Sequence, residues 1–320
     1  MFSGSRERVR LLLRVSRRYY LDGADQWTIG SEVGYSRATI SRLLTEARER
    51  GIIRFSISHP LEQTLELEAR LKQRFGLAAA VVACGASGPS AVGPLAARAV
   101  AERLASHTLV SLAHGAAVAA VVEAMPRLEQ RSCCVTPMTG AVFHVERPGA
   151  DSSALCRALA DRIAGVHRSF SVPMVLPDAP SALRARGDPE VVAALELAAR
   201  ADLALVGVGS MHRLANAPYL LQNHVKTGID EEARRGGAVA RLLGHYLDAR
   251  GRLVPTSLHP RLVGLDPARL AGIGATIVVA WGEAKAPALH AALRSGLLSS
   301  IVTDEPTARA ILATRMAPLA

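Results

Sequence analysis

Long apolar runs, a secretion signal and paired-cysteine motifs are all missing from this 320-residue chain. The longest apolar candidates, such as residues 116–122, fall far short of the ~18–20 residues that a membrane-spanning helix needs. The first residues, MFSGSRERVR, are charged and contain no apolar segment or cleavage site of a signal peptide. The four cysteines lack CxxC spacing and are interpreted as buried thiols, with no zinc-ligand spacing to the histidines: Cys84, Cys133, Cys134 and Cys156. We therefore expect a soluble cytoplasmic protein with no membrane association, no metal and no cofactor.

Lysine is also scarce, because only Lys72, Lys226 and Lys285 accompany 35 arginines. A lysine in so arginine-rich a chain favours a role for a compact ammonium, such as holding a phosphate. Lys285, which follows a predicted strand, is the candidate for that role, and a solvated surface lysine is the alternative.

The length predicts two or three domains, and 49% apolar with 21% charged residues is typical of a globular chain. The net charge of +10 is unevenly distributed. Residues 1–54 hold eleven arginines and six acidic residues, so this sixth of the chain carries half of the excess. A basic segment of this kind indicates a polyanionic partner such as nucleic acid.

Three short helices are predicted in this basic segment, over residues 5–21, 26–33 and 37–50. Asp25 and Ser36 are typical N-caps of the second and third helices, and Gly34 supplies the turn between them. The apolar residues fall at the spacing by which two crossed helices bury a shared face: Ile29, Val33, Tyr35, Ile40 and Leu43. This pattern predicts a helix-turn-helix with residues 37–50 as the recognition helix, and a small helical bundle with a solvated basic face is the alternative.

Polar residues at the start of the predicted recognition helix are suited to reading DNA. Arginine donates two hydrogen bonds to guanine, and serine and threonine bind phosphates or base edges. The residues assigned to DNA binding are Gln26, Thr28, Ser36, Arg37, Thr39, Ser41 and Arg42. The alternating run over 52–57 then predicts a short strand, half of a wing-like hairpin.

Beyond Pro60 the pattern changes. An amphipathic linker helix is predicted over 61–75, and apolar runs then alternate with helical patterns, which indicates a parallel sheet with helices on both faces. The predicted strands cover 79–84, 109–113, 133–137, 203–208, 276–280 and 300–302. The predicted helices lie near 90–105, 116–126, 152–165, 189–200, 285–295 and 305–314. Ligands of such folds bind beyond the carboxyl ends of the strands.

The segment YYLDGADQWTIGSEVGYSRATISRLLTEARERGIIRFSI (19–57) resembles the DNA-reading head of the SorC family of bacterial sugar-responsive transcriptional regulators. The segment WGEAKAPALHAALRSGLLSSIVTDEPTARAIL (281–312) is similar to the closing part of that family. Between them, residues 187–209 resemble a further family stretch, and GGAVARLLGHYLDARGRLV (236–254) resembles the pattern gavgdixgxfxdxxG. Gly30 stands where the family usually has alanine.

The resemblance implies an α/β fold class: a winged-type helix-turn-helix domain (1–58), a linker helix (59–75) and a doubly wound, Rossmann-like, sugar-isomerase-like domain for effector binding and oligomerisation (76–320). The matching effector-site residues are Gly115, Ala116, Ala117, Gly140, Lys285, Thr303, Asp304 and Glu305. Two departures change this site: alanines replace the hydroxyl-bearing residues at 116 and 117, and Trp281 replaces a glycine. Trp281 is interpreted as a core residue, and stacking on a sugar ring is the alternative.

The sequence thus predicts a DNA-binding transcriptional regulator controlled by a sugar or sugar-phosphate effector, acting on double-stranded operator DNA as a homodimer or homotetramer. We expect no catalytic residues. One alternative is an isomerase- or deaminase-like enzyme, against which stands the lack of a convincing general base beside a nucleophile. The other is a DNA-binding regulator whose effector pocket is remodelled or vestigial.

Overall fold

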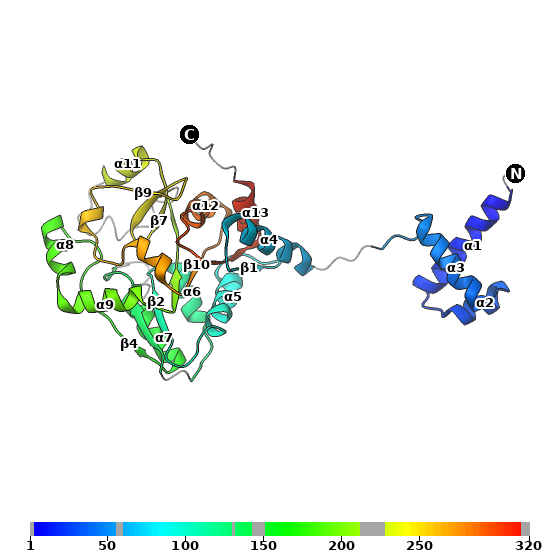
Figure 1. The fold of residues 1–320 in the computed structure, drawn as a ribbon, viewed down its shortest axis with the longest axis horizontal. Coiled ribbons are helices and arrows are strands. Elements are labelled where there is room, and N and C mark those ends of the chain that lie inside the picture. Colours follow the sequence, from blue (N-terminus) through cyan, green and yellow to red (C-terminus); the bar gives the residue numbers. More distant parts are fainter. Residues whose placement is uncertain (1–2, 56–59, 130–131, 143–150, 212–227, 315–320) are drawn as a thin grey trace. The chain divides into compact units, whose positions relative to one another are not determined.

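The computed structural model describes residues 3–55, 60–129, 132–142, 151–211 and 228–314. The chain divides into two units, Met1–His59 and Pro60–Ala320 (Figure 1). Each unit has its own hydrophobic core. No helix within the described ranges is long and apolar enough to cross a membrane.

The first unit consists of the three predicted helices, α1 (Ser3–Tyr20), α2 (Gln26–Val33) and α3 (Arg37–Glu49). Its core is made of apolar residues at helical spacing, among them Leu12, Ile29 and Ile40, each fully buried. Gly34 adopts the left-handed conformation, with φ of 75°, that ends α2. The helix-turn-helix prediction is therefore confirmed in its helices and caps.

The predicted strand over 52–57 is wrong for the residues that the structure describes. After α3 the backbone turns back, and the amides of Ile52 and Ile53 both donate to the carbonyl of Ala47, at 2.9 and 3.2 Å. Both isoleucines pack against the core of the first unit. Their amides cap the carboxyl end of α3 and their side chains pack on its core face, so residues 52–55 form no strand. Residues 56–57 lie outside the described ranges.

The second unit contains a seven-stranded sheet in which every paired strand is parallel, in the order β1-β11-β10-β5-β2-β3-β4. The strands are β1 (Ala79–Ala83), β2 (Leu109–Leu112), β3 (Cys134–Pro137), β4 (Val166–His167), β5 (Leu203–Val206), β10 (Ala275–Val279) and β11 (Ser300–Asp304). Six of these match the predicted strands. The two-residue β4 was not predicted.

Helices cover both faces of this sheet. They are α4 (Pro60–Phe75), α5 (Pro89–Ala101), α6 (Ala116–Ala124), α7 (Ser152–Ile163), α9 (Pro189–Ala199), α12 (Ala286–Arg294) and α13 (Glu305–Ala313), whereas α8 (Ala179–Arg186) packs against α9 and the short 3₁₀ helix η2 (His259–Arg261). Within β5, Leu203 and Leu205 join the cluster with α5, α6 and α7, whereas Ala204 and Val206 join the cluster with α4, α12 and α13. Successive strand residues point to opposite faces, so a strand covered on both sides is apolar throughout. The prediction of a doubly wound α/β fold is confirmed.

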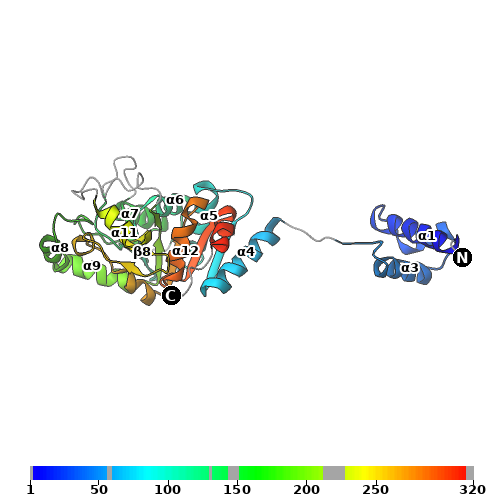
Figure 2. The ribbon, with the colours of Figure 1, turned by 90° about the horizontal axis from the view of Figure 1, so that it is seen from above.

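The helix predicted over 61–75 is α4, and it is packed within the second unit. Leu67 and Leu71 are buried in the cluster that α12 and α13 share, and Figure 2 shows these helices beside α4. The Glu68 carboxylate accepts a 2.8 Å hydrogen bond from the amide of Val82. The Arg74 guanidinium donates to the carbonyl of Leu312 at 2.5 Å. These contacts tie α4 to the sheet and to the end of α13.

A second, antiparallel sheet was not predicted. It has the order β6-β7-β8-β9 and comprises β6 (Gly209–Ser210), β7 (Ala238–Leu242), β8 (His245–Asp248) and β9 (Leu253–Val254), with α11 (Gly228–Arg235) preceding β7. Because β6 begins three residues after β5 ends, this sheet starts at the carboxyl edge of the main sheet. Leu243 and Gly244 form the β7–β8 turn, with φ of 50° and 85°.

Candidate effector site and nucleic-acid interface

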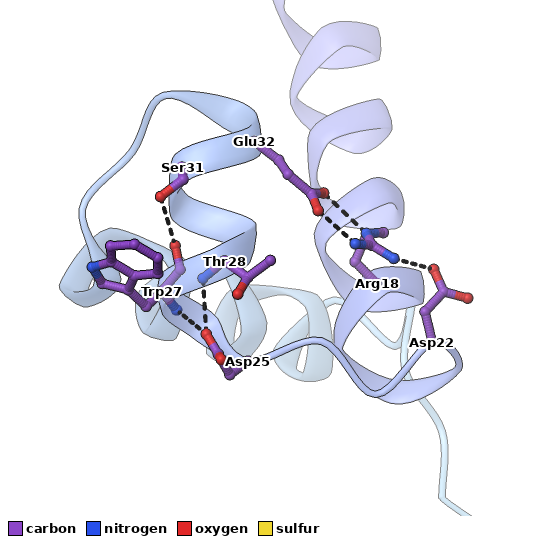
Figure 3. A network of polar contacts seen from close by, with 7 residues as sticks. All are labelled: Arg18, Asp22, Asp25, Trp27, Thr28, Ser31 and Glu32. Carbon is purple, nitrogen blue, oxygen red and sulfur yellow. Dashed lines mark hydrogen bonds and ion pairs between the residues drawn. The ribbon is translucent and has the colours of Figure 1, made fainter.

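The start of α3 is fixed by side-chain caps. The Ser36 hydroxyl accepts a hydrogen bond from the amide of Thr39 at 3.3 Å and lies 2.9 Å from the Thr39 hydroxyl. Asp25 caps α2 in the same manner, accepting from the amides of Trp27 and Thr28 at 2.9 and 2.8 Å (Figure 3). These amides lower the pKa of the Asp25 carboxyl, the largest contribution coming from Thr28. The caps hold the first turns of both helices in place.

Acidic residues of the first unit are engaged by arginines of α1 and the end of α3. Arg18 donates to Glu32 and to Asp22, which joins α1 to α2 and to the turn between them (Figure 3). The hydrogen bond from Arg18 lowers the pKa of the Glu32 carboxyl. Glu46 pairs with Arg8 and with Arg50. These carboxylates therefore do not neutralise the start of α3.

Arg37, Ser41 and Arg42 are exposed on α3, and neither arginine forms a salt bridge among the described residues. Ser36 is also exposed, while Gln26, Thr28 and Thr39 are half-buried. The sequence-assigned residues thus lie at the start of α2 and in the cap and first two turns of α3. Two exposed guanidinium groups that form no salt bridge within the described ranges, beside hydroxyl groups, can bind phosphates and the acceptor edge of guanine.

The carboxyl edge of the main sheet gathers the predicted effector residues. Gly115 precedes α6 after β2, Lys285 ends the short 3₁₀ helix η4 (Glu283–Lys285) after β10, and Thr303 and Asp304 end β11. The loop after β5 approaches the first turn of α6, because a Cβ on Gly207 would lie 3.7 Å from Cβ of Ala117. The unpaired amides of the first turn of α6 and its dipole favour an anion at this edge.

Lys285 is half-buried, and its Nζ lies 5.9 Å from the centre of the Trp281 ring. Trp281 itself is partly buried and packs against the cluster between the sheet and helices α5–α7. The favoured interpretation of Trp281 as a core-packed residue agrees with this position. The contact is a cation–π arrangement that orients the ammonium at the carboxyl edge.

Two of the predicted effector residues have structural partners of their own. Asp304 is 1% exposed, and its carboxylate accepts from the amide of Thr307 at 3.1 Å and from that of Gly88 at 3.4 Å. It therefore caps α13 and anchors the loop before α5. Glu305 pairs with Arg309 one turn later on α13. Thr303 is fully buried, and its hydroxyl has no hydrogen-bond partner in the described part of the chain.

Gly140 is buried where two backbone segments approach each other. A Cβ at this position would lie 2.5 Å from the carbonyl oxygen of Val172 and 2.8 Å from the amide nitrogen of Met174. The amide of Gly140 donates to the carbonyl of Val263 at 3.0 Å. Close packing therefore explains the glycine without a ligand.

Sequence reasoning did not single out Arg241 of β7, which is 6% exposed at the carboxyl edge. Its Nε and Nη1 atoms are buried and have no hydrogen-bond partner in the portion of the chain that the structure describes. A signal was available, because an arginine interrupts an apolar run in GGAVARLLG at the position where the family pattern has an acidic residue. Burial of this side chain depends on the unpredicted second sheet, so the pattern alone did not reveal its environment.

A helix-turn-helix unit joined to a doubly wound α/β unit is typical of proteins that combine a nucleic-acid-binding domain and a small-molecule-binding domain in one chain. Residues 59–313 match the family model Sugar-bind, described as "Putative sugar-binding domain". The transcriptional regulator LsrR of Klebsiella pneumoniae subsp. pneumoniae is 32% identical over 309 residues, which cover 95% of this chain and 93% of that protein. LsrR of Escherichia coli is 28% identical over 304 residues, 93% of each chain.

Solved structures show the same architecture. The full-length sorbitol operon regulator SorC from Klebsiella pneumoniae superposes with a TM-score of 0.76 and 26% identity, covering 95% of this chain and 99% of that chain. The sugar-binding domain of a transcriptional repressor from Vibrio fischeri superposes with a TM-score of 0.71 at 23% identity, covering 78% of this chain and 98% of that chain, which indicates a shared fold. The chain belongs to the SorC family of sugar-binding regulators.

Proposed function

We propose that this protein is a DNA-binding transcriptional regulator whose affinity for its operator is controlled by a sugar or sugar-phosphate effector. One observation carries the proposal: the exposed arginines Arg37 and Arg42, on a capped helix of a helix-turn-helix, form no salt bridge with any described residue. The alignment with transcriptional regulators over 95% of the chain supports it.

On the DNA side, α3 is the recognition helix. Arg37 and Arg42 bind guanine edges or phosphates. The DNA backbone around them is bound by the polar side chains of Ser36, Thr39, Ser41, Gln26 and Thr28. A single helix-turn-helix reads one half-site, so the protein acts as a homodimer or homotetramer on a double-stranded operator with repeated half-sites. In this proposal residues 1–58 read DNA, and the second unit, which includes α4, binds effector and assembles the oligomer.

On the effector side, the ligand lies at the carboxyl edge of the main sheet. The Lys285 ammonium and the backbone amides at residues 115–117 bind its anionic or hydroxyl groups, since the alanines at 116 and 117 offer no side-chain donors. The protein in this proposal is not an enzyme. The carboxylates near this edge support that view, because Asp304 is engaged as a helix cap and Glu305 in an ion pair.

The test is operator binding measured by fluorescence anisotropy, on DNA selected from a random-sequence library by the full-length protein. Arg37→Ala and Arg42→Ala should each weaken binding by about 1–3 kcal/mol, the range for a lost base contact. Arg98→Ala, an exposed arginine of α5, is the matched control and should leave affinity unchanged. Binding should fall steeply with salt, because phosphate contacts release counterions. Unchanged affinity in both Arg37→Ala and Arg42→Ala would place the recognition surface elsewhere.

A further inference from the structure

Arg241 is a buried charge with no counterion among the described residues. Its residue exposure is 6%, and its Nε and Nη1 atoms make no hydrogen bond within that part of the chain. None of the salt bridges formed by described residues involves it. Other buried arginine nitrogens without partners belong to side chains that are less deeply buried, and Arg261 bonds the carbonyl of Leu176 through its Nε at 2.8 Å.

The backbone brings this guanidinium to the carboxyl edge of the main sheet. Arg241 pairs with Gly209 across β6 and β7, and Gly209 follows β5 by three residues. A Cβ on Gly209 would lie 3.3 Å from Nε and 3.6 Å from Nη2 of Arg241, so the guanidinium occupies the space that the glycine leaves empty. Strand β6 also packs beside η4, the helix that ends at Lys285.

An arginine remains protonated at any physiological pH, and removing its charge from water is costly unless the charge is paired. Five N–H donors in a planar fork match the two oxygens of a carboxylate or the oxygens of a phosphate. A buried guanidinium whose Nε and Nη1 have no acceptor in the described part of the chain, at the edge where this fold binds ligands, is a site that an external oxyanion completes.

We propose that Arg241 binds an oxyanion group of the effector, a carboxylate or a phosphate, and so selects acidic sugar derivatives over neutral sugars. This inference rests on the proposed function for the identity of the ligand as an effector. The anion site itself is a property of the second unit and is measured without DNA.

The first experiment compares thermal unfolding of the full-length protein with that of Arg241→Met and Arg241→Gln. In chloride buffer, removing an unpaired buried charge should leave the Tm unchanged or raise it. Arg74→Met is the matched control, because Arg74 is bonded to the carbonyls of Leu312 and Thr314 and its loss should lower the Tm. In sodium phosphate or acetate at equal ionic strength, the Tm of the wild-type protein should rise about 2–4 °C more than that of either Arg241 variant.

The second experiment uses glucose, gluconate and glucose 6-phosphate as probes, to separate a carboxylate from a phosphate ligand. The acidic sugar that stabilises the wild-type protein should bind at least tenfold more weakly to Arg241→Met, and Arg74→Met should retain the wild-type affinity. Equal anion shifts in wild type and both Arg241 variants would overturn the inference. A fall in Tm for both variants like that of Arg74→Met, or failure of both to fold, would overturn it too.

Operator binding separates this inference from the proposed function. If glucose releases the wild-type protein and Arg241→Met equally from DNA, the inference is wrong and the regulator proposal stands. If the protein binds no DNA while phosphate or gluconate stabilises it through Arg241, the anion site stands and the regulator proposal is wrong.

Discussion

Replacement of Asp304 tests whether this residue acts mainly as a buried helix cap. Asp304→Ala removes the acceptor of the Thr307 and Gly88 amides, at 3.1 and 3.4 Å, at a position 1% exposed to solvent. Loss of an N-cap and an unsatisfied buried donor together predict a destabilisation of about 2–4 kcal/mol, with most of it from the shorter Thr307 bond. For a unit of this size the Tm should fall by roughly 5–15 °C.

The assay is thermal unfolding of the second unit by calorimetry, with Asp178→Ala as the matched control. Asp178 caps α8 through the amide of Ser181 at 2.7 Å, but it is exposed, so water replaces the lost acceptor and the Tm change should be clearly smaller. Asp304→Asn retains an acceptor oxygen and should fall between wild type and Asp304→Ala. The reasoning is refuted if Asp304→Ala lowers the Tm no more than Asp178→Ala does.

Two further predictions concern the turn of the helix-turn-helix and the buried histidines. Gly30→Ala would place a Cβ 2.5 Å from the carbonyl oxygen of Tyr35, so the turn must shift and operator affinity should drop at least tenfold. Ser31→Ala, on the exposed face of the same helix, is the control and should leave operator affinity unchanged. Equal anisotropy curves for the two variants would contradict this prediction. Burial lowers the pKa of His245 to about 4, with a smaller contribution from His259. In the unfolded chain the imidazole of His245 binds a proton near pH 6.5, whereas in the folded chain it does so only near pH 4. The free energy of unfolding is therefore unaffected by this group above pH 6.5 and decreases as the pH falls from 6.5 toward 4. The urea midpoint should therefore decrease between pH 7 and pH 5, and by less in His245→Gln.

The head of the protein was predictable because its determinants are local. Asp25 and Ser36 cap the residues that directly follow them, and the positive φ at Gly34 is a property of one residue. The six longer strands of the main sheet were also predictable, since a strand covered on both faces is apolar throughout. Their order was not, because the pairing of β1 with β11 joins segments more than two hundred residues apart.

Other features depended on competition between distant groups. Apolar and polar residues alternate over 53–57 as in a strand, but burial of Ile52 and Ile53 against the core of the first unit and their hydrogen bonds to the carbonyl of Ala47 stabilise a helix end instead. A tight turn at Leu243 requires positive φ from a residue that rarely adopts it, so the hairpin of the second sheet carried no turn signal.

The sequence by itself determined a basic three-helix head, the helix over 61–75 and an alternating α/β body, because caps, glycines and apolar periodicity act over a few residues. That this helix packs within the second unit rather than linking two domains was decided by the tertiary structure. Only the tertiary structure decided what each polar side chain at the carboxyl edge faces. Asp304 accepts hydrogen bonds from the amide of Thr307, three residues later, and from the amide of Gly88, more than two hundred residues earlier. Arg241 is buried over Gly209 by a second sheet that local patterns do not reveal. The free energy of a charge depends on its surroundings, and folding brings those surroundings together from distant parts of the chain.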